Sequence, residues 1–149
     1  MNLTFKRIYP QKDETRRQAV ASFLKQAGLS LEADCEVVVC AEWQNDIVGC
    51  GAIAGNVLKC IAVSPILQGE GLSLKLLTEL LTLAYELNRS ELFLFTKPEN
   101  SVLFSGAGFW PIAQAGTLAV LMKTAASGWP AFAANWRSIV SRERPLAPS

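Results

Sequence analysis

A glycine-rich turn between an apolar segment and a long apolar helix pattern constrains the fold of this chain more than any other feature. The apolar segment ends at Val63, residues 68–71 read Gln-Gly-Glu-Gly, and the helix pattern begins near Leu72. A strand that passes through such a turn into a helix places free backbone N–H groups and the positive end of the helix dipole at one point. Glycines let the main chain curl around a phosphate where a Cβ would intrude. The segment therefore predicts an anion-binding loop. The alternative is a strand-to-helix turn that needs glycine for its geometry alone and would have the same sequence pattern.

Composition and spacing exclude several other functions. The loop has neither the Gly-x-Gly-x-x-Gly spacing of dinucleotide sites nor the Gly-Lys-Ser/Thr ending of a P-loop. The chain contains no histidine, which excludes Ser-His-Asp and Cys-His nucleophiles and zinc sites built on histidine pairs. Its 14 Lys and Arg are scattered and nearly balanced by 13 Asp and Glu. This charge pattern predicts neither nucleic acid nor a membrane surface as a partner.

The cysteines and the N-terminus predict a cytoplasmic protein. The four cysteines show no Cys-x-x-Cys pair, so the spacing predicts neither a disulfide framework nor a structural metal, and we expect reduced thiols. The first ten residues contain no apolar signal segment, and no apolar stretch reaches the length of a membrane span.

Hydrophobic periodicity predicts a mixed order of strands and helices. We expect strands at 3–8, 35–43, 47–54, 57–63, 91–96 and 117–123, and helices at 15–27, 72–87 and 99–107. Gly55-Asn56 predicts a two-residue hairpin turn, and Trp110-Pro111 predicts a break before the last strand. This order predicts an α+β or mixed α/β sheet rather than a doubly wound parallel one.

The length and the 50% apolar content predict one domain over residues 1–124. Residues 125–149 change in character. Ser127 and Pro130 predict the start of a further helix, and the charged, proline-rich end from 142 to 149 predicts a linker.

The glycine loop, the order of elements and a short helix pattern that ends in Gly108-Phe109 resemble the GNAT (Gcn5-related) acyltransferase family over residues 3–123. The resemblance implies a GNAT-like fold, with a central, mostly antiparallel sheet whose fourth and fifth strands splay apart and whose faces are flanked by helices. Within this family, residues 51–64, 68–72 and 95–99 are similar to the N-terminal domain of the citrate lyase ligases.

Citrate lyase ligases use ATP and acetate to acetylate the thiol of a CoA-like prosthetic group on citrate lyase. The resemblance therefore implies an acetyltransferase-like enzyme, with the acyl carrier subunit of citrate lyase as a partner. The family also has a nucleotidyltransferase-like second domain with a His-x-Gly-His motif, which a chain without histidine cannot contain. We expect residues 125–149 to lead toward that second domain, which is absent here.

The resemblance also implies a binding site for acetyl-CoA, CoA or a dephospho-CoA-like group, without a metal. The pantetheine arm would pair with the backbone of residues 61–63 as an added strand, and the pyrophosphate would lie on the glycine loop. The predicted cofactor-binding residues are Ile61, Ala62, Val63, Gln68, Gly69, Glu70, Gly71, Leu72, Ser73 and Phe104.

The catalytic residues stay open at this point. Phe104 stands where many GNAT enzymes carry a tyrosine that protonates the departing thiolate. Lys97 is a candidate for contact with a phosphate, a carboxylate or acetate, or else a solvated loop lysine. Cys60 is either a thiol near the acyl site or a small packed hydrophobe. Glu42 and Glu70 are the acids nearest to the predicted site.

Three functions are compatible with these residues. The first is the CoA-type binding domain of a citrate lyase ligase, which contributes to acetyl transfer. The second is a freestanding N-acetyltransferase that moves acetyl from acetyl-CoA to an amine, and the third is a non-catalytic CoA-binding module. Phe104 favours the first over the second, because a thiol that accepts an acetyl group requires no departing thiolate to be protonated.

Overall fold

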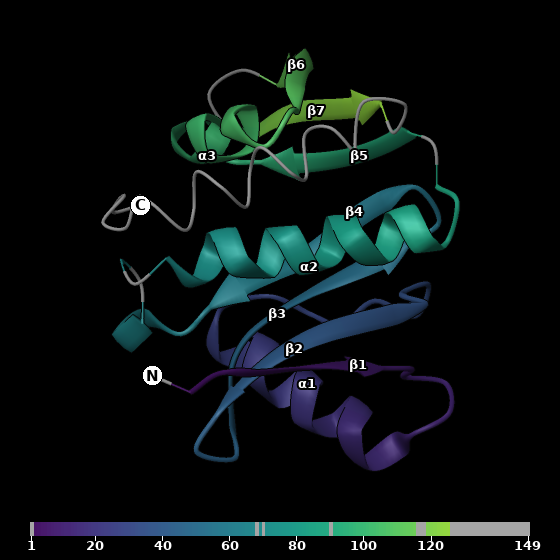
Figure 1. The fold of residues 1–149 in the computed structure, drawn as a ribbon, viewed down its shortest axis with the longest axis vertical. Helices are drawn as coiled ribbons and strands as arrows, with labels where there is room; N and C mark the ends of the chain where they lie inside the picture. Colours follow the sequence, from purple (N-terminus) through teal and green to yellow (C-terminus); the bar gives the residue numbers. More distant parts are fainter. Residues whose placement is uncertain (1, 68, 70, 90, 116–118, 126–149) are drawn as a thin grey trace.

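Strands and helices follow one another in a mixed order along the chain (Figure 1). The computed structural model describes residues 2–67, 69, 71–89, 91–115 and 119–125. The described strands are β1 (Thr4–Ile8), β2 (Val37–Trp43), β3 (Asp46–Ala54), β4 (Val57–Val63), β5 (Glu91–Thr96), β6 (Trp110–Ala115) and β7 (Ala119–Ala125). The described α-helices are α1 (Glu14–Gln26), α2 (Leu72–Glu86) and α3 (Ser101–Gly106), and 3₁₀ turns precede α2 at Pro65–Leu67 and α3 at Pro98–Asn100.

The described strands form one sheet in the order β1-β2-β3-β4-β5-β7-β6. Every neighbouring pair is antiparallel except β4 and β5, which are parallel. The predicted hairpin is present, since Ala54 pairs with Val57 and Gly55 has a φ of +61°. These pairings confirm the predicted mixed α/β fold with a mostly antiparallel sheet.

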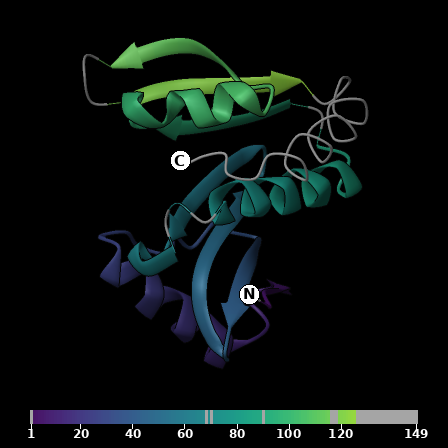
Figure 2. The same cartoon turned by 60° about the vertical axis from the view of Figure 1, so that its left-hand side comes forward.

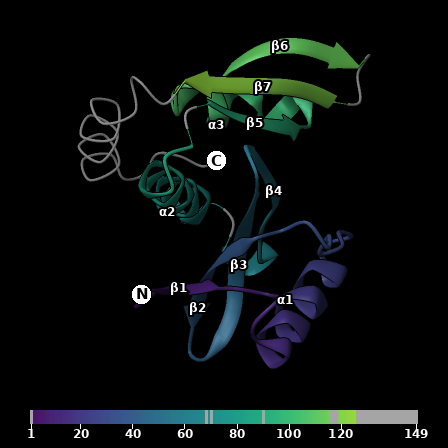
Figure 3. The same ribbon diagram turned by 90° about the vertical axis from the view of Figure 1, so that its right-hand side faces the viewer.

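The strands β2 to β4 are covered by a helix on each face (Figure 3). Successive side chains of a strand point to opposite faces, and β2 shows this directly. Val37 and Val39 belong to the core cluster that contains the α2 leucines, whereas Val38 and Cys40 pack with Val20 and Leu24 of α1. Nearly every residue of β2 is buried, as expected for a strand that lies between two helices.

The helix α2 contributes more buried residues to the larger core than any other element does. Leu76, Leu77 and Leu80 are at most 1% exposed, and each fully buried leucine contributes roughly 1.5–3 kcal/mol. The helix lies very close to β3, because that strand presents glycine beneath it. A Cβ built on Gly51 would lie 2.4 Å from Cδ1 of Leu80, and one on Gly49 would lie 2.8 Å from Cδ1 of Leu76.

The predicted break at Trp110-Pro111 is wrong, because β6 begins at Trp110. Proline lacks the N–H that a central strand requires, but β6 lies at the edge of the sheet and pairs with β7 alone. The register of the pair shifts between Pro111 and Ala113, which accommodates the proline. The helix predicted near Ser127 and Pro130, and the linker beyond it, lie outside the described residues.

The close approach of Gly51 to Leu80 makes a testable contribution to stability. We expect Gly51→Ala to lower the free energy of unfolding by about 1–3 kcal/mol, because the added methyl group overpacks the interface between α2 and β3. Leu80→Ala alone should cost about 2–5 kcal/mol through the cavity it leaves. In the double variant the new methyl group at position 51 enters the space that Leu80→Ala leaves. The double variant should therefore lose less free energy of unfolding than the sum of the losses of the two single variants. Urea unfolding of the four proteins measures this coupling, and strict additivity would contradict the packing described.

Candidate functional site

The strands β4 and β5 separate after a short parallel ladder. Only two residue pairs join them, Val57 with Phe93 and Leu58 with Leu94. The rest of β4 continues along β3 as far as the pair of Val63 with Gly49. In Figures 2 and 3 the group of β5, β6, β7 and α3 diverges from β1–β4. This is the splay that the GNAT resemblance implied.

A bulge in β4 accompanies the separation. Lys59 pairs with Ala52 and Ala62 pairs with Cys50, so Cys60 and Ile61 together lie opposite Gly51. Cys60 has a φ of +55°, a left-handed conformation that few residues other than glycine adopt. Two residues opposite one bend the strand and increase its twist. The bulge therefore turns the C-terminal half of β4 at the point where its ladder with β5 has ended.

Side chains hold the strands together at the other end of β4. Glu36 accepts a hydrogen bond from the Gly55 N–H at 2.6 Å and forms an ion pair with Arg89 at 3.1 Å. Arg89, which precedes β5, also donates to the Gly55 carbonyl. Phe93 N–H donates to the Asn56 carbonyl at 2.8 Å. The hairpin is thus joined to β5 at one end, and the opening lies at the Val63 end, which leads to the glycine loop.

The glycines of the predicted loop adopt left-handed backbone conformations. Gly69 has a φ of +88° and Gly71 a φ of +78°, and a Cβ added at either would meet no protein atom within 4 Å. Within the protein, glycine is therefore required for its backbone conformation rather than for space. Gln68 and Glu70 lie outside the described residues.

The two long helices begin in different ways. Asp13 caps α1 by accepting from the Arg16 N–H at 3.0 Å, and Glu14 adds an acidic side chain to its first turn. Gly71 caps α2 without a side-chain hydrogen bond, and the first turn of α2 contains no acidic residue. Helix geometry leaves the first N–H groups of α2 without acceptors inside the helix. Leu72 anchors this end in the core, and the Ser73 side chain is half-buried.

The candidate catalytic residues lie in different surroundings. Phe104 is buried, and its ring packs edge-on against Phe109 with centroids 6.1 Å apart. Lys97 is exposed at the end of β5, where it precedes the 3₁₀ turn of Pro98–Asn100. Cys60 is half-buried on the side of the sheet that α1 covers, and its Sγ donates to the Ser30 carbonyl at 3.3 Å.

Glu42 is held by two cations. It is 8% exposed, and its carboxylate lies 3.1 Å from Lys6 Nζ and 2.7 Å from Arg16 Nη1. Burial by itself would raise the pKa of Glu42, but the hydrogen bonds from Lys6 and Arg16 outweigh it, and the pKa is lowered. A carboxylate stabilised in its charged form in this way is poorly suited to act as a general base.

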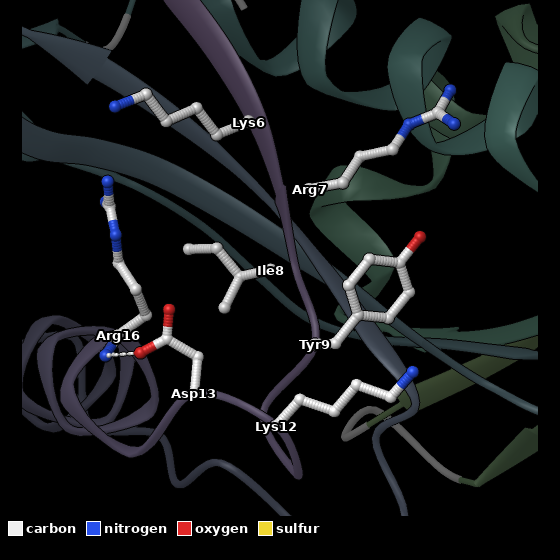
Figure 4. Close-up of a pocket in the computed structure, with 7 residues that line it drawn as sticks. All are labelled: Lys6, Arg7, Ile8, Tyr9, Lys12, Asp13 and Arg16. Atoms are coloured by element: carbon white, nitrogen blue, oxygen red, sulfur yellow. Dashed lines mark hydrogen bonds between the residues drawn. The ribbon is translucent and has the colours of Figure 1, made fainter.

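Sequence reasoning did not identify a cavity of about 320 Å³ beside β1 and the start of α1 (Figure 4). It is lined by Lys6, Arg7, Ile8, Tyr9, Lys12, Asp13 and Arg16. Three of its cations are paired, because Lys6 and Arg16 contact Glu42 and Arg7 contacts Glu86. The cavity lies at the opposite side of β2 and β3 from the opening beside β4. The cluster of cationic residues between positions 6 and 17 was the available sequence signal.

Two absences apply to the described part of the chain. No three His, Cys, Asp or Glu side chains in it are grouped so as to hold a metal ion. None of the helices in these ranges combines the length and the apolar character needed to cross a bilayer.

Comparison of the sequence finds curated relatives but no family model, since none matches the chain. The chain is 72% identical over 123 residues to the [citrate (pro-3S)-lyase] ligase of Klebsiella pneumoniae, an alignment that covers 83% of this chain and 36% of that protein. It is 39% identical over 126 residues to the ligase of Haemophilus influenzae, covering 84% and 37%. The chain thus spans about a third of the length of these relatives, and the match falls in their N-terminal part.

Comparison of the structure finds the same fold in several solved proteins. An acyl-CoA N-acyltransferase from Pseudomonas aeruginosa has a TM-score of 0.73 at 14% identity, over 83% of this chain and 100% of that one. A GNAT-family acetyltransferase from Staphylococcus aureus has a TM-score of 0.61 at 14% identity, over 84% and 99%. N-acetylglutamate synthase from Neisseria gonorrhoeae, complexed with coenzyme A and N-acetyl-glutamate, has a TM-score of 0.61 at 17% identity, over 85% and 35%. These findings confirm the resemblance predicted from the sequence.

The ion pairs of Glu42 predict a pH dependence of stability. Because the pKa of Glu42 is lowered on folding, its stabilisation is complete above the ordinary glutamate value of about 4.3 and is lost as the pH falls through the folded-state pKa. We expect Glu42→Gln to lower the free energy of unfolding by about 2 kcal/mol at pH 7 and by much less near pH 3. Denaturant unfolding across this pH range measures the difference.

Glu86→Gln is the matched control for this prediction. Glu86 pairs with Arg7 at 2.8 Å, but the carboxylate is on the surface, where ion pairs contribute little. A loss for Glu42→Gln no greater than that for Glu86→Gln at pH 7 would contradict the account.

Proposed function

We propose that this chain, which has the fold of the GNAT acyltransferases and a sequence similar to the N-terminal part of citrate lyase ligase, binds CoA or a dephospho-CoA-like group. The ligand lies in the opening between β4 and β5, with its pyrophosphate at the start of α2. The observation that carries the proposal is the position of these two features. The ladder of β4 with β5 ends after Leu58, and β4 then leads to the start of α2, whose N-cap residue, Gly71, has no side chain to cap the helix.

The opening offers backbone groups to the pantetheine arm. After Leu58, no ladder with β5 pairs with the facing edge of β4 within the described residues. The arm carries amide groups, so it can add to β4 as an extra strand.

The start of α2 offers charge complementarity to the pyrophosphate. The N–H groups of its first turn and the helix dipole attract an anion, and the left-handed Gly69 and Gly71 set the path of the chain toward them. The contrast with α1 supports this assignment, because Asp13 already occupies the equivalent position there. Residues Gln68 and Glu70 complete the proposed binding segment.

The proposed reaction is acetyl transfer in which a CoA-type thiol is the acceptor, as part of a citrate lyase ligase whose partner is the acyl carrier subunit of citrate lyase. Phe104 supports this choice over transfer to an amine, because its ring has no proton to give to a departing thiolate. When bound, the CoA-type group supplies the reacting thiol. The chain's own part is to bind and orient that group, with Lys97 as the candidate side chain near the acyl end. The Cys60 side chain lies instead on the face of the sheet that α1 covers.

Calorimetry with CoA, acetyl-CoA and dephospho-CoA tests the binding site. We expect binding of CoA or dephospho-CoA, weakened about tenfold by Gly71→Ala, which corresponds to about 1.4 kcal/mol. The matched control is Gly28→Ala, because Gly28 has the same φ of +78° and the same empty surroundings but follows α1. Both substitutions place alanine at the same left-handed φ, and only the first changes the loop. No binding of any of the three ligands, or equal weakening by both variants, would overturn the proposed site.

An amine acetylation assay separates the proposed reaction from its alternatives. We expect no steady acetylation of amines by the native chain with acetyl-CoA, and a measurable gain in Phe104→Tyr, which restores a phenolic O–H at that position. Steady turnover by the native chain would instead support a freestanding N-acetyltransferase. If Phe104→Tyr binds acetyl-CoA and remains inactive, the missing proton is not what limits the reaction, and a non-catalytic binding module is then favoured.

A further inference from the structure

The segment before β2 lies against the bulge of β4. Lys59 Nζ forms ion pairs with Glu32 at 2.6 Å and with Asp34 at 2.9 Å. The next residue, Cys60, donates from its Sγ to the Ser30 carbonyl at 3.3 Å. Cys35, which follows Asp34, belongs to the buried cluster against which Cys60 packs, and the thiols of Cys35 and Cys60 interact. Two thiols from segments 25 positions apart in the sequence are therefore adjacent in the fold.

The two thiols differ in accessibility and acidity. Cys35 is fully buried, whereas Cys60 is half-buried. The hydrogen bond from Cys35 lowers the pKa of Cys60, and Lys59 acts in the same direction, while burial and the charge of Glu32 oppose them. The same hydrogen bond, together with burial and the charge of Asp34, raises the pKa of Cys35. Cys60 is thus the more accessible and the more acidic of the two thiols, and Cys35 lies beside it.

The other two cysteines of the same cluster provide an internal contrast. Cys40 and Cys50 face each other across β2 and β3, and both are fully buried. Burial raises the pKa of Cys40 to about 12, and it also raises the pKa of Cys50. Cys50 donates from its Sγ to the Cys60 carbonyl at 3.5 Å. Both the pair of Cys35 with Cys60 and the pair of Cys40 with Cys50 are therefore close in the fold. Only the first pair contains a partly exposed thiol, Cys60, with a charged lysine beside it.

We propose that Cys35 and Cys60 form a redox-sensitive dithiol that closes to a disulfide in the presence of a peroxide. The Cys60 thiolate attacks one oxygen of the peroxide, whose O–O bond breaks, and the sulfur becomes a sulfenic acid as hydroxide leaves and is protonated. The Cys35 sulfur then attacks the Cys60 sulfur, its proton passes to the departing hydroxyl, and water leaves. Both thiols together lose two electrons, the peroxide gains them, and two waters form.

This pair lies on the side of the sheet that α1 covers, and the inference does not depend on the proposed CoA site. It adds a modification site at the residue that forms the bulge of β4. The disulfide would link the segment before β2 to that bulge.

Peptide mapping of the native chain after treatment with hydrogen peroxide tests the proposal. Remaining thiols are blocked with N-ethylmaleimide, and the unreduced chain is cleaved with trypsin and an endoprotease specific for glutamate. The second enzyme is needed because Cys35, Cys40 and Cys50 share one tryptic peptide, which cleavage after Glu36 and Glu42 divides. We expect the thiol count to fall from four to two, with one linked peptide pair that contains Cys35 and Cys60 and that dithiothreitol separates. An unchanged count, a link through Cys40 or Cys50, or a link between two chains would overturn the proposal.

Variants separate the hydrogen bond from simple proximity. We expect Cys35→Ala to slow alkylation of Cys60 by iodoacetamide at pH 7 about fivefold, since fewer Cys60 side chains are ionised. Cys35→Ser retains a hydrogen-bond donor and should keep most of the native rate, yet it cannot form the disulfide. Cys40→Ala is the matched control, because it removes another buried thiol and should leave both the alkylation and the linked peptide unchanged. Equal alkylation rates for Cys35→Ala and Cys35→Ser would contradict the assigned role of Cys35.

Discussion

The bulge in β4 is the feature on which the rest of the candidate site depends. Cys60 and Ile61 occupy the space opposite a single residue, Gly51, just after the ladder between β4 and β5 ends. A regular strand would continue beside β5 and satisfy the facing backbone groups with a protein ladder. The bulge turns β4 away instead, while Arg89 and Glu36 keep the hairpin end closed. The opening and its closed end are thus built by a few local contacts.

The position of α2 connects this opening to the glycine loop. The helix lies close to β3 because Gly49 and Gly51 have no side chains, and its leucines fill the core above that strand. Leu72 is buried at the first position of the helix, so the packing that stabilises the fold also fixes where the helix N-terminus lies. Gly51 contributes both to the packing of α2 and to the bulge, since it lies beneath Leu80 and opposite the bulge residues of β4. Stability and the geometry of the candidate site are therefore set by the same interface.

Sequence reasoning succeeded where a local pattern determines local structure. The leucine periodicity of α2 and the Gly55-Asn56 turn follow from propensities that neighbours do not override. It failed at Pro111, because whether a proline can join a strand depends on whether that strand lies at an edge, and this is a property of the whole sheet. The splay was expected only through the GNAT resemblance, since no pattern in the residues of β4 indicates where its ladder with β5 ends.

The site residues show the same division. The binding loop was predicted from a contiguous motif and the β4 segment from the GNAT resemblance, and both stay predictions. The contact between Cys35 and Cys60 and the ion pairs of Glu42 instead join segments far apart in the chain. The sequence predicted four reduced thiols and singled out Cys60 as a candidate for the acyl site, and in the fold Cys60 is the least buried of the four. Such pairings depend on strand register, which single-sequence patterns do not specify between distant strands.

The central claim is that a CoA-type ligand occupies the opening between β4 and β5 and rests on the start of α2. Titration of the isotope-labelled chain with dephospho-CoA, followed through its backbone amide resonances, tests this residue by residue. The account predicts that the amides of Ile61 and Ala62 and those of Gly69 and residues 71–73 shift together, while Lys6 to Arg16 beside the basic cavity stay unchanged. Shifts confined to that cavity, or a saturating ligand that moves none of the β4 and loop amides, would contradict it.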